Sequence, residues 1–273
     1  MREINPLFIA DINKGPLKDL YVLCSQGCWL GIRKNYINIY YRGGNALKIG
    51  QTSNGYTFSF DAKYCKNIND ESNFEYLSKL DRKDLVGWAE AFPVIKMEMD
   101  SWFLLHPKPE REFQHRLLES KHNEFEIIDI EYAGWTKEGK SFRLDMLAVY
   151  HNRIVIIENK YGQGAIGGKA GLKKHYDDIV SIIDYPESRE VLIGSVKSIV
   201  RNKKALGLTS ILFDYSGEIE ILFLMAEYNP KSKAISNEVG RIEKTLPAKI
   251  LFMTKEEGII HYETAKDLWE YGV

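Results

Sequence analysis

The chain has 273 residues, of which 44% are hydrophobic and 27% charged, with a formal net charge of −1 and three cysteines. This composition excludes disordered, collagen-like and low-complexity classes and is sufficient for a sizeable core in one large domain or two small ones. The cysteines are sparse and odd in number, which is unlike a disulfide framework. No apolar run reaches the roughly 18–20 residues of a membrane span, and the first residues lack the apolar core of a signal peptide. We therefore expect a cytoplasmic protein that does not contact a membrane.

The positive charge is concentrated in one window of the sequence, residues 136–175. Eight Lys and Arg stand there against three Asp and Glu, a surplus of five in a chain whose formal sum is −1. Binding to a phosphate backbone depends on the local field, so a net charge near zero does not exclude a nucleic-acid partner.

The first third of the chain predicts strands. Short apolar runs lie at Leu20–Leu23, Asn38–Tyr41, Ala46–Ile49 and Tyr56–Phe60. Glycine-containing turns separate them, which is typical of hairpins. We expect a small strand-rich module over residues 1–76. Helix-like sequence from Leu77 to Leu105, which Pro93 is expected to split, predicts a helical connector over residues 77–108.

A third region, residues 109–273, begins at Pro109, which suits the first turn of a helix over Glu110–Ser120. The strands predicted after it are Phe125–Tyr132, Phe142–Tyr150, Arg153–Lys160, Glu190–Gly194, Glu220–Ala226 and Lys249–Thr254, with helices at Lys169–Ile183 and Val196–Ala205. Three successive strands before a helix disfavour a doubly wound fold. The order predicts an α+β domain with a central mixed sheet flanked by helices.

A tight hairpin is predicted around His151-Asn152, because Asn tolerates the left-handed conformation of such a turn. In an antiparallel pair centred there, Asp145 faces Glu158 across the ladder, with their Cβ atoms about 4.5–5.5 Å apart. Lys160 and Arg143 project from the same face as these two acids.

Two opposed carboxylates repel each other unless a cation or a proton intervenes. Hard oxygen ligands suit Mg²⁺ or Mn²⁺, and the neighbouring Lys160 adds a positive charge that can hold a water or a phosphate oxygen. The alternative is an exposed hairpin on which all of these charges are simply solvated.

The residues also match a known pattern. Asp145, twelve intervening residues and then Glu158-Asn159-Lys160 resemble the bipartite core of the PD-(D/E)XK nuclease superfamily, in a context of a preceding acidic helix, strands in meander order and a following basic helix. The resemblance covers about Glu110 to Asp184. Leu144 replaces the proline of the formal motif, and Asn159 is polar where the intervening residue is often apolar.

The resemblance implies a restriction-endonuclease-like core and metal-dependent hydrolysis of phosphodiester bonds in nucleic acid, with DNA as the first expectation. Asp145 and Glu158 would hold Mg²⁺ (or Mn²⁺) together with the Asn159 carbonyl, and Lys160 would orient the attacking water. Whether cleavage is endo- or exonucleolytic stays open. Cutting both strands of a duplex would favour a homodimer.

The helix that begins near residue 110 would supply a further acid. Glu110 falls on the side of Phe113 and Leu117, which faces the sheet, whereas Glu112 points away. Glu110 is therefore the preferred catalytic acid of this helix.

Four basic residues are candidates for binding nucleic-acid phosphates: Arg143, Lys169, Lys173 and Lys174. Lysines at a helix N-terminus oppose the helix dipole unless an anion also binds there. The alternative is that Lys173 and Lys174 pair with Asp177 and Asp178 one turn later. His175 is expected to be a packed side chain and not a catalytic one.

Two other functions stay open. The chain could be a non-catalytic nucleic-acid- or protein-binding member of the same fold, although such a protein has no physical need for opposed acids. It could also be an unrelated α+β enzyme. Residues 162–167 fit the G-x-G-x-x-G pattern of dinucleotide-binding loops, but the charged end of the preceding strand counts against that interpretation.

Overall fold

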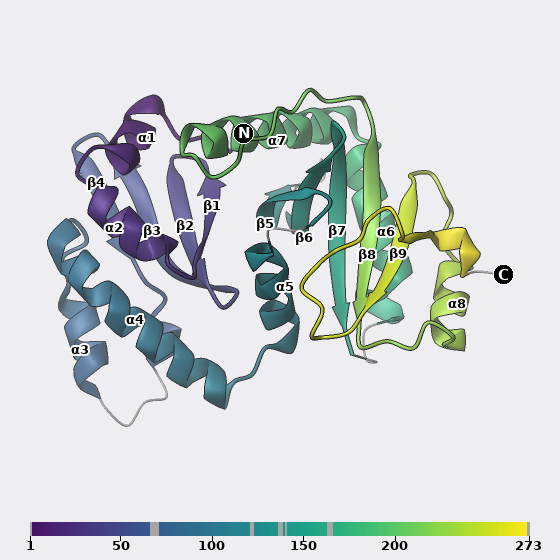
Figure 1. The fold of residues 1–273 in the computed structure, drawn as a ribbon, viewed down its shortest axis with the longest axis horizontal. Coiled ribbons are helices and arrows are strands. Elements are labelled where there is room, and N and C mark those ends of the chain that lie inside the picture. The colour runs from purple at the N-terminus through teal and green to yellow at the C-terminus, as the bar shows by residue number, and fades with distance from the viewer. Residues whose placement is uncertain are drawn as a thin grey trace. The chain divides into compact units, whose positions relative to one another are not determined.

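The computed structural model describes residues 2–65, 71–120, 123–135, 139, 141–162 and 166–271. The chain divides into two compact units (Figure 1). The first consists of Arg2–His115 and Arg201–Ser210, and the second of Arg116–Val200 and the chain from Ile211 onward. This division differs from the three predicted regions, because the segment predicted as a connector belongs to the first unit and a short distant segment joins it.

The first unit is built on an antiparallel sheet in the order β1-β2-β3-β4. Its elements are α1 (Pro6–Asn13), α2 (Lys18–Ser25), β1 (Trp29–Arg33), β2 (Tyr36–Tyr41), β3 (Gly44–Thr52), β4 (Gly55–Ser59), the 3-10 helix η1 (Ala62–Cys65), α3 (Glu71–Lys79), α4 (Leu85–Leu105) and the start of α5 (Pro109–Glu119). Three of the predicted strands are confirmed here, and β1 was not among the predicted strands.

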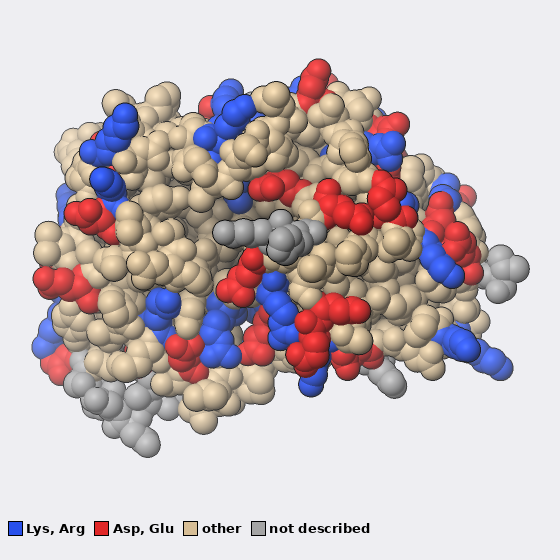
Figure 2. Space-filling model, in the orientation of Figure 1, with Lys and Arg blue, Asp and Glu red and all other residues tan. Residues whose placement is uncertain are grey.

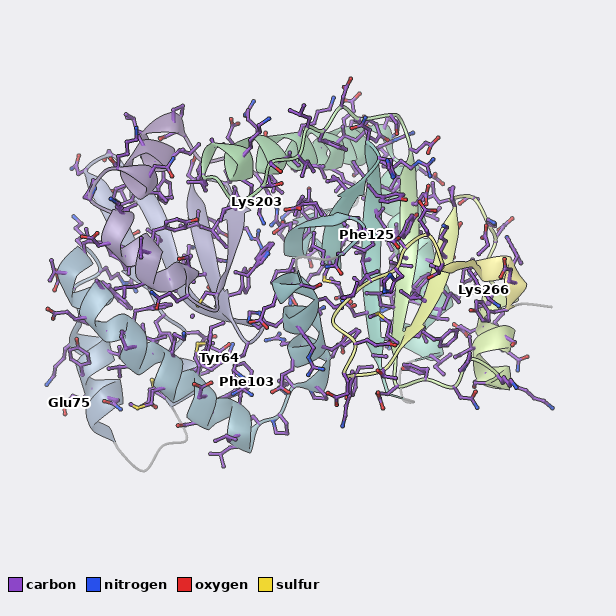
Figure 3. All side chains as sticks on the ribbon, viewed as in Figure 1. Tyr64, Glu75, Phe103, Phe125, Lys203 and Lys266 are labelled. Atoms are coloured by element: carbon purple, nitrogen blue, oxygen red, sulfur yellow. The ribbon has the colours of Figure 1, made fainter. Side chains whose placement is uncertain are left out.

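The core of the first unit lies on one face of this sheet. Ile32, Ile37 and Leu47 are buried there, as apolar residues that alternate with polar ones along their strands. Helix α4 packs against β3 and β4, and its Phe103 lies 5.9 Å from Tyr64, measured between ring centroids (Figure 3).

Two predictions in this unit are wrong. Leu20–Leu23 is part of α2 and not a strand, because a short apolar run has no periodicity of its own and the buried positions, Leu20 and Cys24, have helical spacing. Helix α4 is not split at Pro93. Pro93 is exposed, whereas its neighbour Phe92 is buried, so packing of the buried side holds the helix together across the missing hydrogen bond.

The second unit is built on a six-stranded mixed sheet in the order β10-β9-β8-β7-β6-β5. Its elements are the end of α5, β5 (Glu126–Trp135), β6 (Ser141–Tyr150), β7 (Arg153–Tyr161), η2 (Gly168–Ala170), α6 (Leu172–Ile183), most of α7 (Pro186–Ala205), β8 (Ile219–Ala226), α8 (Lys233–Val239), β9 (Ala248–Met253), β10 (Lys266–Asp267) and η3 (Leu268–Glu270). Strands β5, β6 and β7 form an antiparallel meander, and β7, β8 and β9 are parallel. The predicted α+β class with a mixed sheet is confirmed.

The predicted strand at Glu190–Gly194 is wrong, because these residues lie inside α7. Leu192, Val196 and Ile199 are buried at helical spacing, so the short apolar run is one part of a longer amphipathic pattern. With this strand removed, the chain passes from β7 through α6 and α7 to the parallel strand β8.

The predicted hairpin turn is confirmed. His151 and Asn152 have φ angles of 43° and 65°, as a two-residue turn of the primed type requires. The β6–β7 ladder pairs Tyr150 with Arg153 and continues to Met146 and Ile157, which is the predicted register.

The surface of the described residues shows mixed charge. On the face drawn in Figure 2, Lys and Arg are interspersed with Asp and Glu. Part of the basic window, residues 136–138, 140 and 163–165, lies outside the described residues. Among the helices that the structure describes, none is both long and apolar enough to cross a membrane.

Candidate active site

The central sheet of the second unit forks at the predicted site. The β6–β7 ladder ends at Met146 and Ile157, after which β6 stays paired with β5 and β7 stays paired with β8. Asp145 and Glu158 are the first residues beyond the last pair, one on each branch. The predicted register therefore reaches the site, but the two acids lie where the strands separate and not inside the ladder.

One hydrogen bond spans the fork. The backbone N–H of Asn159 donates to Oδ2 of Asp145 at 2.9 Å. Asp145 is half-buried, so this carboxylate keeps access to solvent while one of its oxygens is fixed against β7. A charged acceptor makes this bond stronger than a neutral one.

Glu158 is almost completely buried, with 1% of its surface exposed. Its Oε2 accepts no hydrogen bond within the part of the chain that the structure describes. Nδ1 of His175, on α6, lies 2.9 Å from this oxygen, which is an ion-pair distance when the imidazole is protonated, although the contact lacks hydrogen-bond geometry. A buried carboxylate oxygen without a donor is costly, and a bound cation would remove that cost.

Lys160 follows two positions after Glu158 and therefore projects from the same face of β7. It is also buried, with 6% of its surface exposed, and it makes no ion pair with any carboxylate of the described residues. The intervening Asn159 projects from the opposite face, where neither its amide nitrogen nor its amide oxygen has a hydrogen-bond partner among those residues.

The residues at the fork fit a hard divalent cation. Asp145 offers a partly accessible carboxylate, and Glu158 offers a buried oxygen without a donor. Over the residues that the structure describes, no group of three His, Cys, Asp or Glu is arranged to hold a metal. Two carboxylates nevertheless suit Mg²⁺, which usually keeps several waters and takes one or two protein carboxylates.

The predicted helix acid and the fork belong to different units. Glu110 is exposed in the first turn of α5, and it belongs to the first unit, whereas Asp145 and Glu158 belong to the second. Glu112 is held by Arg42, whose Nη2 lies 2.9 Å from its carboxylate. The role assigned to Glu110 remains a prediction.

The four basic residues differ in their surroundings. Arg143 pairs with Glu131 at 2.9 Å. Lys173 pairs with Asp177 and Lys174 with Asp178, so the alternative of pairing within α6 is confirmed. Lys169 is exposed in η2 and makes no ion pair with any described residue.

An acid that the sequence did not indicate lies at the start of α6. Glu238 of α8 is buried, and its carboxylate accepts a hydrogen bond from the backbone N–H of Lys173 at 3.4 Å. This carboxylate partly offsets the positive end of the α6 dipole. The sequence predicts neither the approach of Glu238 to α6 nor that of His175 to Glu158, because only tertiary packing brings these residues together. His175 itself was predicted to be a packed side chain.

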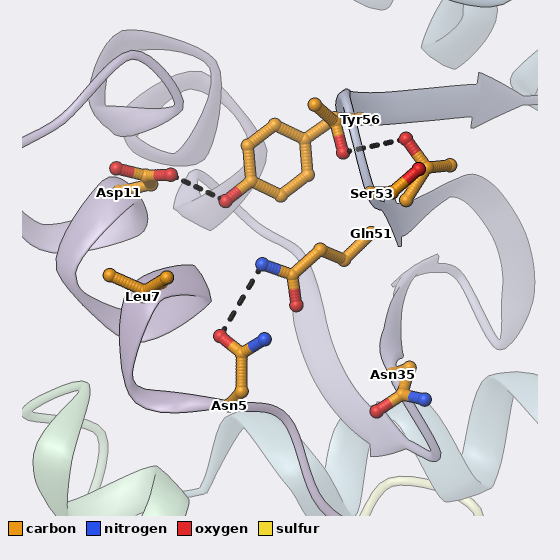
Figure 4. A pocket seen from close by; sticks show the side chains of 9 residues that line it. Asn5, Leu7, Asp11, Asn35, Gln51, Ser53 and Tyr56 are labelled. Atoms are coloured by element: carbon orange, nitrogen blue, oxygen red, sulfur yellow. Dashed lines mark hydrogen bonds between the residues drawn. The ribbon is translucent and has the colours of Figure 1, made fainter.

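A separate pocket of about 530 Å³ lies in the first unit (Figure 4). Asp11 accepts a hydrogen bond from the hydroxyl of Tyr56 at 2.6 Å, and Gln51 donates to Asn5 at 3.3 Å across the pocket wall. Its lining residues include neither Lys nor Arg, so the pocket does not offer the charge that a phosphate needs.

No protein-family model matches the chain, and neither a curated protein nor a solved structure matches it. The case for a function therefore rests on the residues at the fork.

Proposed function

We propose that the chain is a metal-dependent nuclease that hydrolyses phosphodiester bonds in nucleic acid, with DNA as the first substrate to test. The observation that carries the proposal is the fork between β6 and β7. Asp145 and Glu158 are the first residues beyond its last pair, Lys160 follows Glu158 on the same face of β7, and one buried carboxylate oxygen of Glu158 has no donor among the described residues.

The order of elements supports a restriction-endonuclease-like core. A helix containing Glu110 and Glu112 precedes the β5–β6–β7 meander, and α6 with its lysines follows it. This is the context that accompanies the Asp145…Glu158-Asn159-Lys160 motif in the PD-(D/E)XK resemblance.

In this proposal Asp145 and Glu158 hold Mg²⁺ or Mn²⁺, together with the backbone carbonyl of Asn159. When bound, the ion supplies Lewis acidity to the scissile phosphate and lowers the pKa of a coordinated water. The ammonium group of Lys160 orients the attacking water and offsets the negative charge that develops on the phosphate in the transition state.

The remaining residues act on the substrate around the scissile bond. Arg143, Lys169, Lys173 and Lys174 bind neighbouring phosphates, and Glu110 serves as the additional acid. A cytoplasmic location and a homodimer for double-strand cleavage complete the proposal.

The test is a cleavage assay on the full chain with Mg²⁺ or Mn²⁺ and labelled DNA and RNA, single- and double-stranded. Asp145→Asn and Lys160→Met are compared with Asp214→Asn and Lys197→Met, which make the same changes at exposed positions of the second unit. We expect Asp145→Asn and Lys160→Met to lower the cleavage rate about a hundredfold or more, and the two control variants to cleave at the wild-type rate.

Unchanged cleavage in both Asp145→Asn and Lys160→Met would show that the fork is not the active site. Tight binding without cleavage of any substrate by the wild type would favour the alternative, a non-catalytic binding protein of the same fold.

A further inference from the structure

The β1–β4 sheet of the first unit has a second face that differs from its apolar one. Opposed residues in the ladder share a face, and the pairs Arg33–Tyr36, Trp29–Tyr40 and Asn38–Lys48 are opposed. We call the face that carries these six residues the polar face.

The apolar side of this sheet is where the helices of the unit pack. Helix α4 contacts β3 and β4, and Phe8 of α1 lies against Tyr56 of β4, with 5.0 Å between ring centroids. Figure 1 shows α1, α2 and α4 grouped beside the sheet. Successive side chains of a strand point to opposite faces of the sheet, and Tyr56 projects from the apolar face of β4 whereas Thr57 projects from the polar face. Helix α1 therefore lies on the side of the sheet away from the polar face.

The charge on the polar face has one sign. None of the four strands contains Asp or Glu, and their charged residues are Arg33 and Lys48. Lys203, at the end of α7, adds a third cation, with its Nζ 3.8 Å from the centroid of the Trp29 ring. Arg33 and Lys203 are buried, with 5% and 4% of their surface exposed, so Lys48 is the one of these three cations that an anionic partner can reach.

Aromatic rings accompany each of these cations. Nζ of the exposed Lys48 lies 4.1 Å from the centroid of the half-buried Tyr36 ring, and the Arg33 guanidinium lies 5.9 Å from that of Tyr40. Tyr40 and Arg33 are both buried, so Tyr36 and Lys48 are the pair that a ligand can reach. A ring can stack on a base and a cation beside it can neutralise a phosphate, so the Tyr36–Lys48 pair suits single-stranded nucleic acid.

A hydrogen-bonded layer supports the rings. The hydroxyl of Tyr40 accepts hydrogen bonds from Arg33 at 2.9 Å and from the Asn38 amide at 3.2 Å. The amide oxygen of Asn38 has no partner within the described part of the chain.

We propose that the polar face binds single-stranded nucleic acid, with Tyr36 stacking on a base and Lys48 binding the adjacent phosphate. The proposal rests on the proposed nuclease function for its choice of nucleic acid over an acidic protein. A single strand fits better than a duplex because only unpaired bases present their ring faces to Tyr36.

The test measures binding without cleavage. The full chain is kept in EDTA and titrated into fluorescein-labelled single-stranded DNA and RNA of about twenty nucleotides, and into the matching duplex. Tyr36→Ala and Lys48→Ala are compared with Tyr36→Phe, which keeps the ring, and with Lys83→Ala, at an exposed lysine of the same unit. Circular dichroism melts check that each variant is folded.

We expect Tyr36→Ala and Lys48→Ala each to weaken single-strand binding about tenfold, with Tyr36→Phe and Lys83→Ala close to wild type. Lys48→Ala should also reduce the steepness of the plot of log affinity against log salt concentration by about one, because one phosphate contact is lost. Equal binding by all variants, tighter binding of duplex, or equal displacement by polyglutamate would overturn the proposal.

The two proposals can fail separately. If binding depends on Tyr36 and Lys48 but no metal-dependent cleavage occurs, the polar face is supported as a binding site and the proposed nuclease function is wrong. Cleavage that depends on Asp145, combined with binding that ignores Tyr36 and Lys48, would do the reverse.

Discussion

Asp145 accepts a hydrogen bond from the backbone of Asn159 at the point where β6 and β7 stop pairing. One carboxylate oxygen thus ties the two branches of the sheet together, while the residue also serves as a proposed metal ligand. The structural and the chemical roles of Asp145 can be separated by choosing the replacement.

Asp145→Asn keeps an oxygen that can accept the Asn159 N–H, whereas Asp145→Ala does not. We expect Asp145→Ala to lower the free energy of unfolding by about 1–3 kcal/mol and Asp145→Asn to lower it by less, with both inactive. Urea unfolding monitored by circular dichroism measures the difference. Equal stability of the two variants would mean that the hydrogen bond does not hold the fork.

Glu158→Gln replaces a buried charge with a neutral amide of the same shape. In EDTA we expect the melting temperature to rise by about 2–4 °C for each kcal/mol of burial cost removed, because Oε2 lacks a donor in the described structure. Stabilisation by added Mn²⁺ should disappear. A variant that melts lower than wild type in EDTA would show that the His175 contact outweighs the cost of burial.

The basic residues near α6 should not contribute equally to nucleic-acid binding. Lys169 makes no ion pair with the described residues, whereas Lys173 and Lys174 each have an aspartate partner. Lys169→Ala should therefore weaken binding more than either of the other two alanine variants and lower the salt slope by about one. Fluorescence anisotropy at several salt concentrations ranks the three. An equal effect of all three would show that the aspartates do not shield their lysines.

Pro93→Ala should stabilise the protein. The proline is exposed inside the continuous helix α4, and alanine restores a backbone N–H without leaving a cavity. We expect a gain of about 1–3 kcal/mol in the free energy of unfolding and unchanged cleavage. Val86→Ala, at another exposed position of α4, is the control and should change stability by less than about 0.5 kcal/mol. A loss of stability would mean that α4 needs its proline.

The protein should lose stability at alkaline pH. Burial raises the pKa of Cys28 and of Cys65 from 9.0 to about 11, and burial with the hydrogen bond to Asp100 raises the pKa of Tyr41 from 10.0 to about 12. Each group holds its proton more tightly in the folded state than in the unfolded state. Its contribution to the free energy of unfolding is therefore complete below about pH 9 and is lost as the pH rises through 11 to 12.

Melting curves from pH 8 to pH 11 test this expectation. The double variant Cys28→Ala/Cys65→Ala should show a shallower decline with pH, whatever its absolute stability at pH 8. A decline as steep as that of the wild type would assign the alkaline transition to other groups.

Local chemistry made the hairpin predictable. Asn152 at a two-residue turn fixed the register of β6 and β7, and that register brought Asp145 and Glu158 to adjacent branches. Short apolar runs were less informative, because Leu20–Leu23 and Glu190–Gly194 read equally well as strand or helix until their buried positions are known.

The remaining features of the site depend on partners that are distant in sequence. Beyond Met146 and Ile157, β6 pairs with β5 and β7 pairs with β8, and no local pattern in either strand specifies where their mutual pairing stops. The approach of His175 to Glu158, and of Glu238 to the start of α6, depends in the same way on how helices pack.

The first unit includes residues Arg201–Ser210, which follow most of the second unit in the sequence and are therefore synthesised after it. Asn13 donates a hydrogen bond to the carbonyl of Ala205, Arg201 pairs with Glu3, and Lys203 covers the Trp29 ring. A protease cut or a stop codon within α5 would therefore leave an N-terminal fragment with an uncovered tryptophan and unmatched polar groups. Such a fragment should be hard to express alone, and supplying a peptide of residues 201–210 in trans would be the natural way to rescue it.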